Sequence, residues 1–384
     1  MKYEKKILNI LQKTLGNKRC GLHEPLFTGN ENNYLNDCIN STFVSSVGKY
    51  VDKFEKELAT YTGAKRAIAV SNGTSALQIS LKLAGVIEGD EVLVPSLTFV
   101  GTVNAILYLG AIPHFIDSEK ETFGADPKSL ILWLKKSTDL TSQGCINRKT
   151  GRRIKCLVPV HIFGHPCKLD ELLSIAYDYN LTVVEDAAEG LGSFYYGKHV
   201  GTFGKLGILS FNGNKVITTG GGGAILTNDE LLADQAKHLT TTAKVPHKWK
   251  YIHDTIGYNF RMPNLNAALG LAQLEQLDSF ILSKRKLYDV YENEFKKIKD
   301  IRLIKEPKGC KSNYWLQTIL LNQSIFDKQD IILEFINNHN FMIRPSWTLI
   351  HKLLPYKKFP RAPIKTSLTL EKGIINLPSS AGLI

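Results

Sequence analysis

The feature that most constrains the fold of this 384-residue chain is an alternation of short apolar runs with helical patterns. The apolar runs, each interpreted as a β-strand, occupy residues 67–70, 91–97, 112–117, 156–164 and 181–188. The stretches between them are long enough for helices and carry apolar residues at helical spacing. Helices between successive strands are the connections that parallel strands require. The pattern therefore predicts an α/β fold with a mostly parallel sheet flanked by helices.

Polar residues stand where several of these strands end. They are Asp117, His161, Asp186 and the turn at residues 95–96. In parallel sheets, ligands bind at the carboxyl ends of the strands. The sequence therefore predicts a site at this edge.

The flanking segments predict two further units. Residues 1–21 are basic, and their apolar residues recur at the spacing of an amphipathic helix rather than as a signal-peptide core. After a helix over 264–295 come short strands around a helix, which predicts a smaller α/β domain. We expect a helical extension over 1–21, a large domain over 22–280 and a small C-terminal domain over 281–384.

Composition narrows the class of protein. The six cysteines are scattered without a CxxC pair, which favours free thiols and gives no metal site. No stretch is apolar enough to predict a membrane span, and we expect a cytoplasmic protein. The net charge of +12 is spread along the chain without a nucleic-acid-binding motif, so we expect no nucleic-acid partner. A basic surface also suits a polyanionic small molecule.

Within residues 183–223, one strand pattern ends in Glu185 and Asp186, and Lys215 lies between a second strand pattern and four glycines. A buried unpaired charge costs several kcal/mol. Pyridoxal phosphate (PLP) satisfies both charges, because its ring nitrogen pairs with an aspartate and its aldehyde condenses with a lysine. The stretch therefore predicts a PLP site. Glu185 points to the other face of the strand and is interpreted as structural.

The turn after residues 67–70 predicts a phosphate site. It places Gly73, Thr74 and Ser75 at the start of a helix, where free backbone N–H groups and the helix dipole favour an anion. Ser210 supplements this cup. The alternative interpretation of the turn is a plain helix cap at Ser71 or Thr74. Gly220 to Gly223 are expected to permit close backbone approach, since no GxGxxG or Walker pattern accompanies them.

Four segments carry a family resemblance: SNGTSALQISL, VEDAAEGLGS, LSFNGNKVITTGGGG and GYNFRMPNLNAALGLAQLEQL. They resemble the DegT/DnrJ/EryC1/StrS family of nucleotide-sugar aminotransferases, in particular the branch of legionaminic acid and bacillosamine-type synthesis. The resemblance implies a PLP-dependent aminotransferase of fold type I that acts as a homodimer with its active site at the interface. It also leads us to expect a helix beyond the last residue, so that the tail is either truncated or naturally short.

The resemblance assigns roles to single residues. Lys215 is the PLP lysine, where dehydratase relatives carry histidine, and Asp186 pairs with the ring nitrogen. Phe99 stacks on the cofactor ring, and Asn259 reaches the phosphate from the partner subunit. Two further cofactor-binding candidates are His161, which either orients the cofactor or is structural, and Glu189, which replaces the more widespread glutamine.

The nucleotide-sugar pocket is expected to include Lys244, His247, Trp249, Arg261, His23 and Glu24. The implied reaction moves an amino group from L-glutamate to a nucleotide-linked 4-keto-6-deoxy sugar for a bacterial surface glycan, with UDP-2-acetamido-2,6-dideoxy-4-hexulose as the first expectation. A GDP-perosamine-type synthase, a 3-keto sugar aminotransferase and a non-catalytic PLP-fold regulator are the alternatives.

Overall fold

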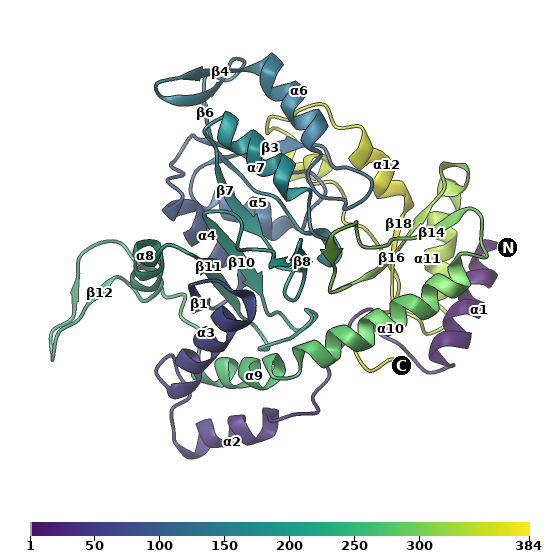
Figure 1. Ribbon diagram of the computed structural model, residues 1–384, viewed down its shortest axis with the longest axis horizontal. Coiled ribbons are helices and arrows are strands. Elements are labelled where there is room, and N and C mark those ends of the chain that lie inside the picture. Colours follow the sequence, from purple (N-terminus) through teal and green to yellow (C-terminus); the bar gives the residue numbers. More distant parts are fainter. Residues whose placement is uncertain (1) are drawn as a thin grey trace.

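A computed structural model, which describes residues 2–384, contains two larger sheets joined by a long helix (Figure 1). The path of the larger, nine-stranded sheet runs in the order β1 (Arg66–Val70), β11 (Gly223–Thr227), β10 (Leu206–Ser210), β7 (Thr182–Asp186), β6 (Arg153–Leu157), β2 (Glu91–Pro95) and β3 (Ile112–Ile116). All of these strands are parallel except β11, which is antiparallel to both neighbours. The predicted α/β fold with a mostly parallel sheet is confirmed.

Helices pack against this sheet directly or, as α2 (Glu31–Asn40) does, against another helix. They are α2, α3 (Lys49–Thr62), α4 (Gly73–Leu83), α5 (Val100–Leu107), α6 (Pro127–Ser137), α7 (Leu169–Asp178), α8 (Glu230–Thr240) and α9 (Asn264–Leu274). Helix α4 packs on β10 and β11, and α7 packs on β7. The apolar residues between the layers form one large core.

Three local expectations differ from the structure. The run 156–164 leaves the strand conformation after Leu157, because β6 pairs with β7 only to that point. A hairpin of β4 (Thr138–Thr141) and β5 (Gly144–Asn147) extends the sheet at β6 and was not predicted. The single helix expected over 264–295 is divided between residues 274 and 277 into α9 and α10 (Leu277–Phe295).

The second sheet is antiparallel, with the order β14 (Ile301–Leu303), β16 (Gln317–Leu321), β18 (Ile374–Leu377) and β17 (Arg344–Pro345). Its helices are α11 (Gln329–Asn337) and α12 (Thr366–Gly373). The N-terminal helix α1 (Tyr3–Leu15) places Ile7 and Leu11 in the same core as Ile319 and Ile332. We propose residues 22–280 and 281–384 as the two domains, with α1 packed into the second.

Helix α10 joins these two domains. Phe280, near its start, lies in the core of the large sheet, whereas Phe295, at its end, lies in the core of the small sheet. In Figure 1 it crosses the lower part of the molecule from one unit to the other.

The remaining elements are short. A three-stranded sheet contains β8 (Phe194–Tyr195), β9 (Lys198–His199) and β15 (Cys310–Lys311), and 3₁₀ turns occupy Ile162–Gly164, Gln323–Lys328, Ile350–Lys352 and Leu354–Tyr356. The hairpin of β12 (Lys244–Val245) and β13 (Ile252–His253) extends away from the body of the molecule (Figure 1). The six cysteines are free. Within residues 2–384, no helix has the length and apolar character needed to cross a membrane.

Candidate active site

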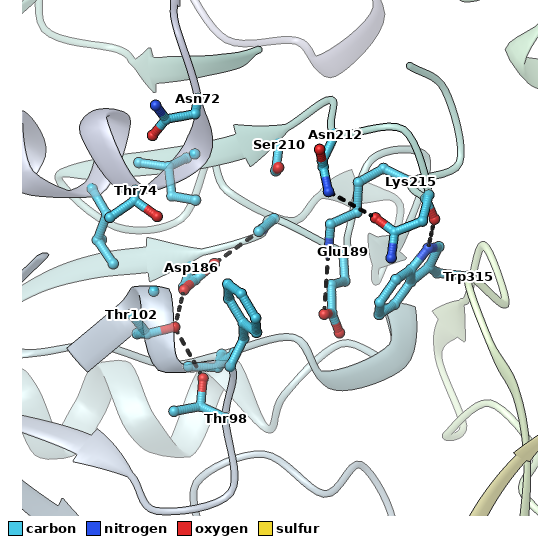
Figure 2. Close-up of a pocket in the computed structure, with 18 of the residues that line it drawn as sticks. Asn72, Thr74, Thr98, Thr102, Asp186, Glu189, Ser210, Asn212, Lys215 and Trp315 are labelled. Atoms are coloured by element: carbon cyan, nitrogen blue, oxygen red, sulfur yellow. Dashed lines mark hydrogen bonds and ion pairs between the residues drawn. The ribbon is translucent and has the colours of Figure 1, made fainter. Parts of the chain in front are cut away.

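A cavity of about 260 Å³ lies at the carboxyl ends of β1, β7 and β10 (Figure 2). Residues of both proposed domains line it, because Trp315 and Trp347 belong to the proposed second domain. The polar residues that line it are Asn72, Thr74, Thr98, Thr102, Asp186, Glu189, Ser210, Asn212, Asn214 and Lys215.

Asp186 is the last residue of β7 and is 5% exposed. Thr102 Oγ1 donates a hydrogen bond to its Oδ2 at 2.7 Å, and the Ala188 N–H donates to its Oδ1 at 3.1 Å. Burial raises the pKa of Asp186, and these two hydrogen bonds oppose that rise. A buried carboxylate without a bonded cation calls for a positively charged partner on the cavity side.

Lys215 follows β10 and directs its side chain into the cavity. Its Nζ lies 3.2 Å from Glu189 Oε1 and 3.9 Å from the centre of the Trp315 ring. The Trp315 Nε1–H donates to the Asn214 carbonyl at 2.6 Å, which ties this ring to the loop that carries the lysine. The amine is therefore held between a carboxylate and an aromatic face.

Glu189 closes the same corner of the cavity. Its Oε2 accepts a hydrogen bond from the Phe163 N–H at 2.8 Å, while Oε1 faces Lys215. Burial raises the pKa of Glu189, and the charge of Lys215 opposes that rise. The carboxylate therefore has partners within the protein and stands beside the lysine amine.

The opposite end of the cavity is the start of α4. Asn72, rather than the expected Ser71 or Thr74, caps this helix, and its Oδ1 accepts from the Ser75 N–H at 2.8 Å. Gly73, Thr74 and Ser210 line the cavity here, but Ser75 does not. The Ser75 N–H is bonded to the cap and its side chain is buried beside that of Ser71, so its place in the cup stays a prediction.

Gly223 lets β11 approach this helix start. A Cβ on Gly223 would lie 2.5 Å from the Asn72 carbonyl carbon, a distance that a side chain cannot adopt without moving the backbone. The predicted close approach at the glycine run is therefore present at this position.

The model of the DegT/DnrJ/EryC1/StrS aminotransferase family matches residues 26–384. The chain belongs to this family. Aminotransferases of the family use PLP, so the protein is a PLP-dependent sugar aminotransferase.

Individual relatives agree with this assignment. A GDP-perosamine synthase from Escherichia coli O157:H7 is 40% identical over 94% of this chain and 93% of its own length. A UDP-4-amino-4,6-dideoxy-N-acetyl-beta-L-altrosamine transaminase from Campylobacter jejuni is 32% identical over 81% of this chain and 79% of its own. Among solved structures, PseC of Helicobacter pylori, an aminotransferase in pseudoaminic acid biosynthesis, superposes with a TM-score of 0.86 at 26% identity, over 96% of this chain and 95% of that one.

The cavity fits the cofactor of the family. A buried aspartate without a bonded cation lies at one wall, as a protonated pyridine nitrogen requires. A lysine amine lies at another wall, and the start of α4 supplies free backbone N–H groups for a phosphate. We propose that Asp186, Lys215, Gly73, Thr74 and Ser210 hold PLP.

Aromatic rings form the apolar walls of this aminotransferase cavity. Phe99 lines it and is 53% exposed, with its ring 6.5 Å from that of Trp347. The Trp347 ring lies 5.2 Å from that of Phe163. We propose that Phe99 stacks on the cofactor, as the family resemblance implies.

His161 is not among the residues that line the cavity, and its role toward the cofactor stays a prediction. Its Nε2 is bonded to Glu185 at 3.0 Å, and its Nδ1 accepts from the Cys167 N–H at 3.1 Å. Glu185 also accepts hydrogen bonds from the N–H groups of Gly201, Phe203 and Gly204. Both side chains are thus bonded into the fold beneath the site.

The remaining substrate-binding candidates fall into two groups. Lys244, His247, Trp249, Arg261 and the cofactor candidate Asn259 do not line the cavity of their own chain. They lie in or beside the extended hairpin. His23 and Glu24 line a second cavity that adjoins the first.

Among the residues that sequence reasoning missed are Asn72, Thr102, Trp315 and Trp347. Asn72 carried a local signal, since asparagine is a strong helix cap. Thr102 lies at helical spacing after Phe99 and could have been found by placing that helix beside Asp186. The two tryptophans carried no local signal, because they reach the cavity from the other domain.

Proposed function

We propose that the protein transfers the amino group of an L-amino acid, L-glutamate, to the 4-keto carbon of a nucleotide-linked 6-deoxy sugar for a bacterial surface glycan. The observation that carries the proposal is the placement of Lys215 and Asp186 in one cavity of a chain that is 40% identical, along almost its whole length, to a GDP-perosamine synthase. The first candidate acceptor is therefore GDP-4-keto-6-deoxymannose.

The second candidate acceptor is the UDP-linked 2-acetamido-2,6-dideoxy-4-hexulose expected from the sequence. It is supported by the resemblance of the motifs to the legionaminic acid branch and by the Campylobacter transaminase, whose printed name is that of a UDP-sugar enzyme. The transferred group and the chemistry are the same for both acceptors.

Different residues of the protein have different roles in this reaction. When bound, PLP supplies an aldehyde that exchanges amines and a ring that withdraws electrons from the carbon that loses its proton. Asp186, oriented by Thr102 and the Ala188 N–H, keeps the ring nitrogen protonated. The helix start at Gly73 and Thr74, with the Ser210 hydroxyl, binds the phosphate.

Lys215 moves the proton. With PLP bound, its Nζ would accept the proton from the α-carbon of the amino acid and would hold it at the site for return. Glu189 and Trp315 hold Nζ between them, which limits the orientations it can take. The rings of Trp315, Trp347 and Phe99 exclude water from the reacting atoms.

We also propose a homodimer whose hairpin reaches the neighbouring subunit's site. The support is that Asn259, Lys244 and His247 do not line their own cavity, while Trp249 on the hairpin is 74% exposed. An exposed aromatic hairpin is a surface that favours a protein partner. Sedimentation of the holoenzyme tests the assembly, and a monomer at micromolar concentration would refute it.

The first experiment follows the absorbance of purified protein loaded with PLP. L-Glutamate should bleach the cofactor band near the visible edge, and the acceptor sugar should then restore it. Separate additions of the GDP- and UDP-linked 4-keto sugars identify the nucleotide.

Substitutions in the same experiment test which residues bind the cofactor and carry out the reaction. Lys215→Ala should lose the band and the reaction, and Asp186→Asn should keep the band but bleach at least a hundredfold more slowly. Lys205→Ala, an exposed lysine, is the matched control and should behave as the wild type. A wild-type protein without a band in excess PLP would refute the enzyme assignment.

A further inference from the structure

A second cavity, of about 560 Å³, adjoins the cofactor cavity. The two share Asn214, Trp315 and Trp347 as lining residues, so a ligand in the second cavity lies next to the wall that holds Lys215. Much of the second cavity is apolar, with Leu22, Phe163, Leu316, Met342 and Pro345 among its lining residues.

Two buried polar side chains face this cavity without a partner. His23 is 9% exposed and Ser346 is 7% exposed, and among residues 2–384 no hydrogen bond is made by either ring nitrogen of His23 or by Ser346 Oγ. Buried polar groups are rarely left unpaired in native proteins. Burial, together with the charges of Lys284 and Lys215, lowers the pKa of His23 well below its usual range, so the ring is neutral, with one donor and one acceptor.

Two exposed charges of opposite sign complete the lining. Arg344 Nη1 has only long hydrogen bonds, 3.3 Å to Asn337 Oδ1 and 3.4 Å to the Ile343 carbonyl. The Glu24 carboxylate accepts one hydrogen bond, from the Gly21 N–H at 3.3 Å. Neither side chain forms an ion pair with another described residue of the chain.

We propose that this second cavity binds the free amino acid that donates the amino group, with Arg344 on a carboxylate and Glu24 on the ammonium. A free amino acid carries both charges, whereas a nucleotide sugar offers an anionic diphosphate and no cation, which would leave Glu24 unpaired. His23 and Ser346 supply hydrogen bonds to a second carboxylate, which suits a dicarboxylic donor.

The inference rests on the proposed transamination and refines it. It moves His23 and Glu24 from the nucleotide sugar, where the sequence placed them, to the amino donor. It also separates the two substrates, with the donor recognised beside the wall formed by the two tryptophans.

Two probes test the proposal on the PLP-loaded protein. L-Glutamate is followed by bleaching of the cofactor band, and glutarate, a dicarboxylate without an amino group, is followed by calorimetry without any reaction. Arg344→Gln should weaken both ligands by about tenfold or more, because it removes a charged hydrogen bond from a carboxylate. Glu24→Gln should weaken L-glutamate by a similar factor but leave glutarate binding unchanged.

The acceptor reaction separates this inference from the proposed function. In protein first converted by saturating L-glutamate, neither substitution should change the acceptor concentration for half-maximal recovery of the band by more than about twofold. Arg152→Gln, an exposed arginine remote from both cavities, is the matched control. Because Arg344 and Glu24 are both exposed, the substitutions should leave the fold intact.

The outcomes distinguish a failure of the proposed function from a failure of this inference. Wild-type protein that no amino acid bleaches overturns the proposed function and this inference with it. Wild-type bleaching that neither variant weakens, or an effect confined to the nucleotide sugar, overturns only the inference. Loss of glutarate binding in Glu24→Gln overturns the assignment of Glu24 to the ammonium.

Discussion

Lys284 is a buried lysine whose replacement should change how stability depends on pH. It lies on α10 and is fully buried, and its Nζ donates to the Trp315 carbonyl at 3.1 Å and to the Ser379 carbonyl. Within residues 2–384, no carboxylate pairs with it, and burial lowers its pKa well below the usual range. This shift favours the neutral amine in the folded protein.

The sign of the effect follows from proton binding. Between the lowered folded pKa and the unfolded value near 10.4, the unfolded chain binds one more proton at Lys284 than the folded chain. The free energy of unfolding then rises with pH by about 1.4 kcal/mol per pH unit, and the gain ends above the unfolded pKa. In Lys284→Met this contribution is absent.

The two hydrogen bonds of Lys284 determine the size of the stability difference between the wild type and Lys284→Met. Methionine would leave two buried carbonyls unpaired, at about 1–3 kcal/mol each. Near pH 10 the wild type should therefore be more stable than Lys284→Met by about 2–6 kcal/mol. At lower pH the cost of deprotonating the lysine reduces this advantage.

Urea unfolding of both holoproteins, followed by tryptophan fluorescence at pH 7.5, 8.5 and 9.5, measures the difference. It should grow as the pH rises, by up to about 2.7 kcal/mol over these two pH units, because other titrations are common to both proteins and cancel. Lys286→Met, an exposed lysine on the same helix, is the control and should show a constant difference. A constant difference for Lys284→Met would mean that the buried amine is charged and would refute the reasoning.

Three further substitutions test the site. Thr102→Val removes the hydrogen bond to Asp186 Oδ2 and should reduce kcat/KM about tenfold while leaving the fold intact, and an unchanged kcat/KM would contradict the orienting role. Glu185→Gln removes a buried carboxylate whose pKa is lowered in the fold, so it should reduce the free energy of unfolding by about 3 kcal/mol near pH 7. The wild type should lose stability as the pH falls below about 4.5, and the variant should show a smaller loss. Thermal unfolding at several pH values measures both effects. Gly223→Ala should displace the helix start at Asn72 and weaken PLP about tenfold in a titration, whereas pyridoxal, which lacks the phosphate, should bind as before.

Much of the large domain could be predicted from the sequence because its signals are local. Each apolar run between residues 67 and 188 is bounded by polar turns, and each intervening helix carries its own apolar stripe. Asp186 at a strand end and Lys215 beside flexible glycines were visible for the same reason. Their common cavity follows from the rule that parallel strands end at one edge of the sheet.

The rest depended on contacts between distant residues. Trp315 touches Lys215 across 100 positions of sequence, and nothing in its neighbours indicates that contact. His161 stands at the correct end of its strand, yet Glu185 and the Cys167 N–H take both ring nitrogens. The position at a strand end fixes where a side chain leaves the backbone, but its hydrogen-bond partners determine its orientation.

The two domains contribute different things to the site, and this division has a consequence for specificity. The phosphate end, Asp186 and Lys215 all come from the large domain, whereas Trp315, Trp347 and Arg344 come from the small one. The residues proposed to hold the cofactor thus lie in one proposed domain. The side chains around the reacting atoms include residues of the other.

Lys284 links these two contributions. It lies on the helix that joins the cores, and it holds the carbonyl of the tryptophan whose ring contacts the lysine amine. A change in how α10 packs would therefore move the substrate-facing wall relative to a cofactor that stays in place. Substitutions on the small domain should accordingly alter KM for one substrate more readily than they alter the absorbance of the bound cofactor.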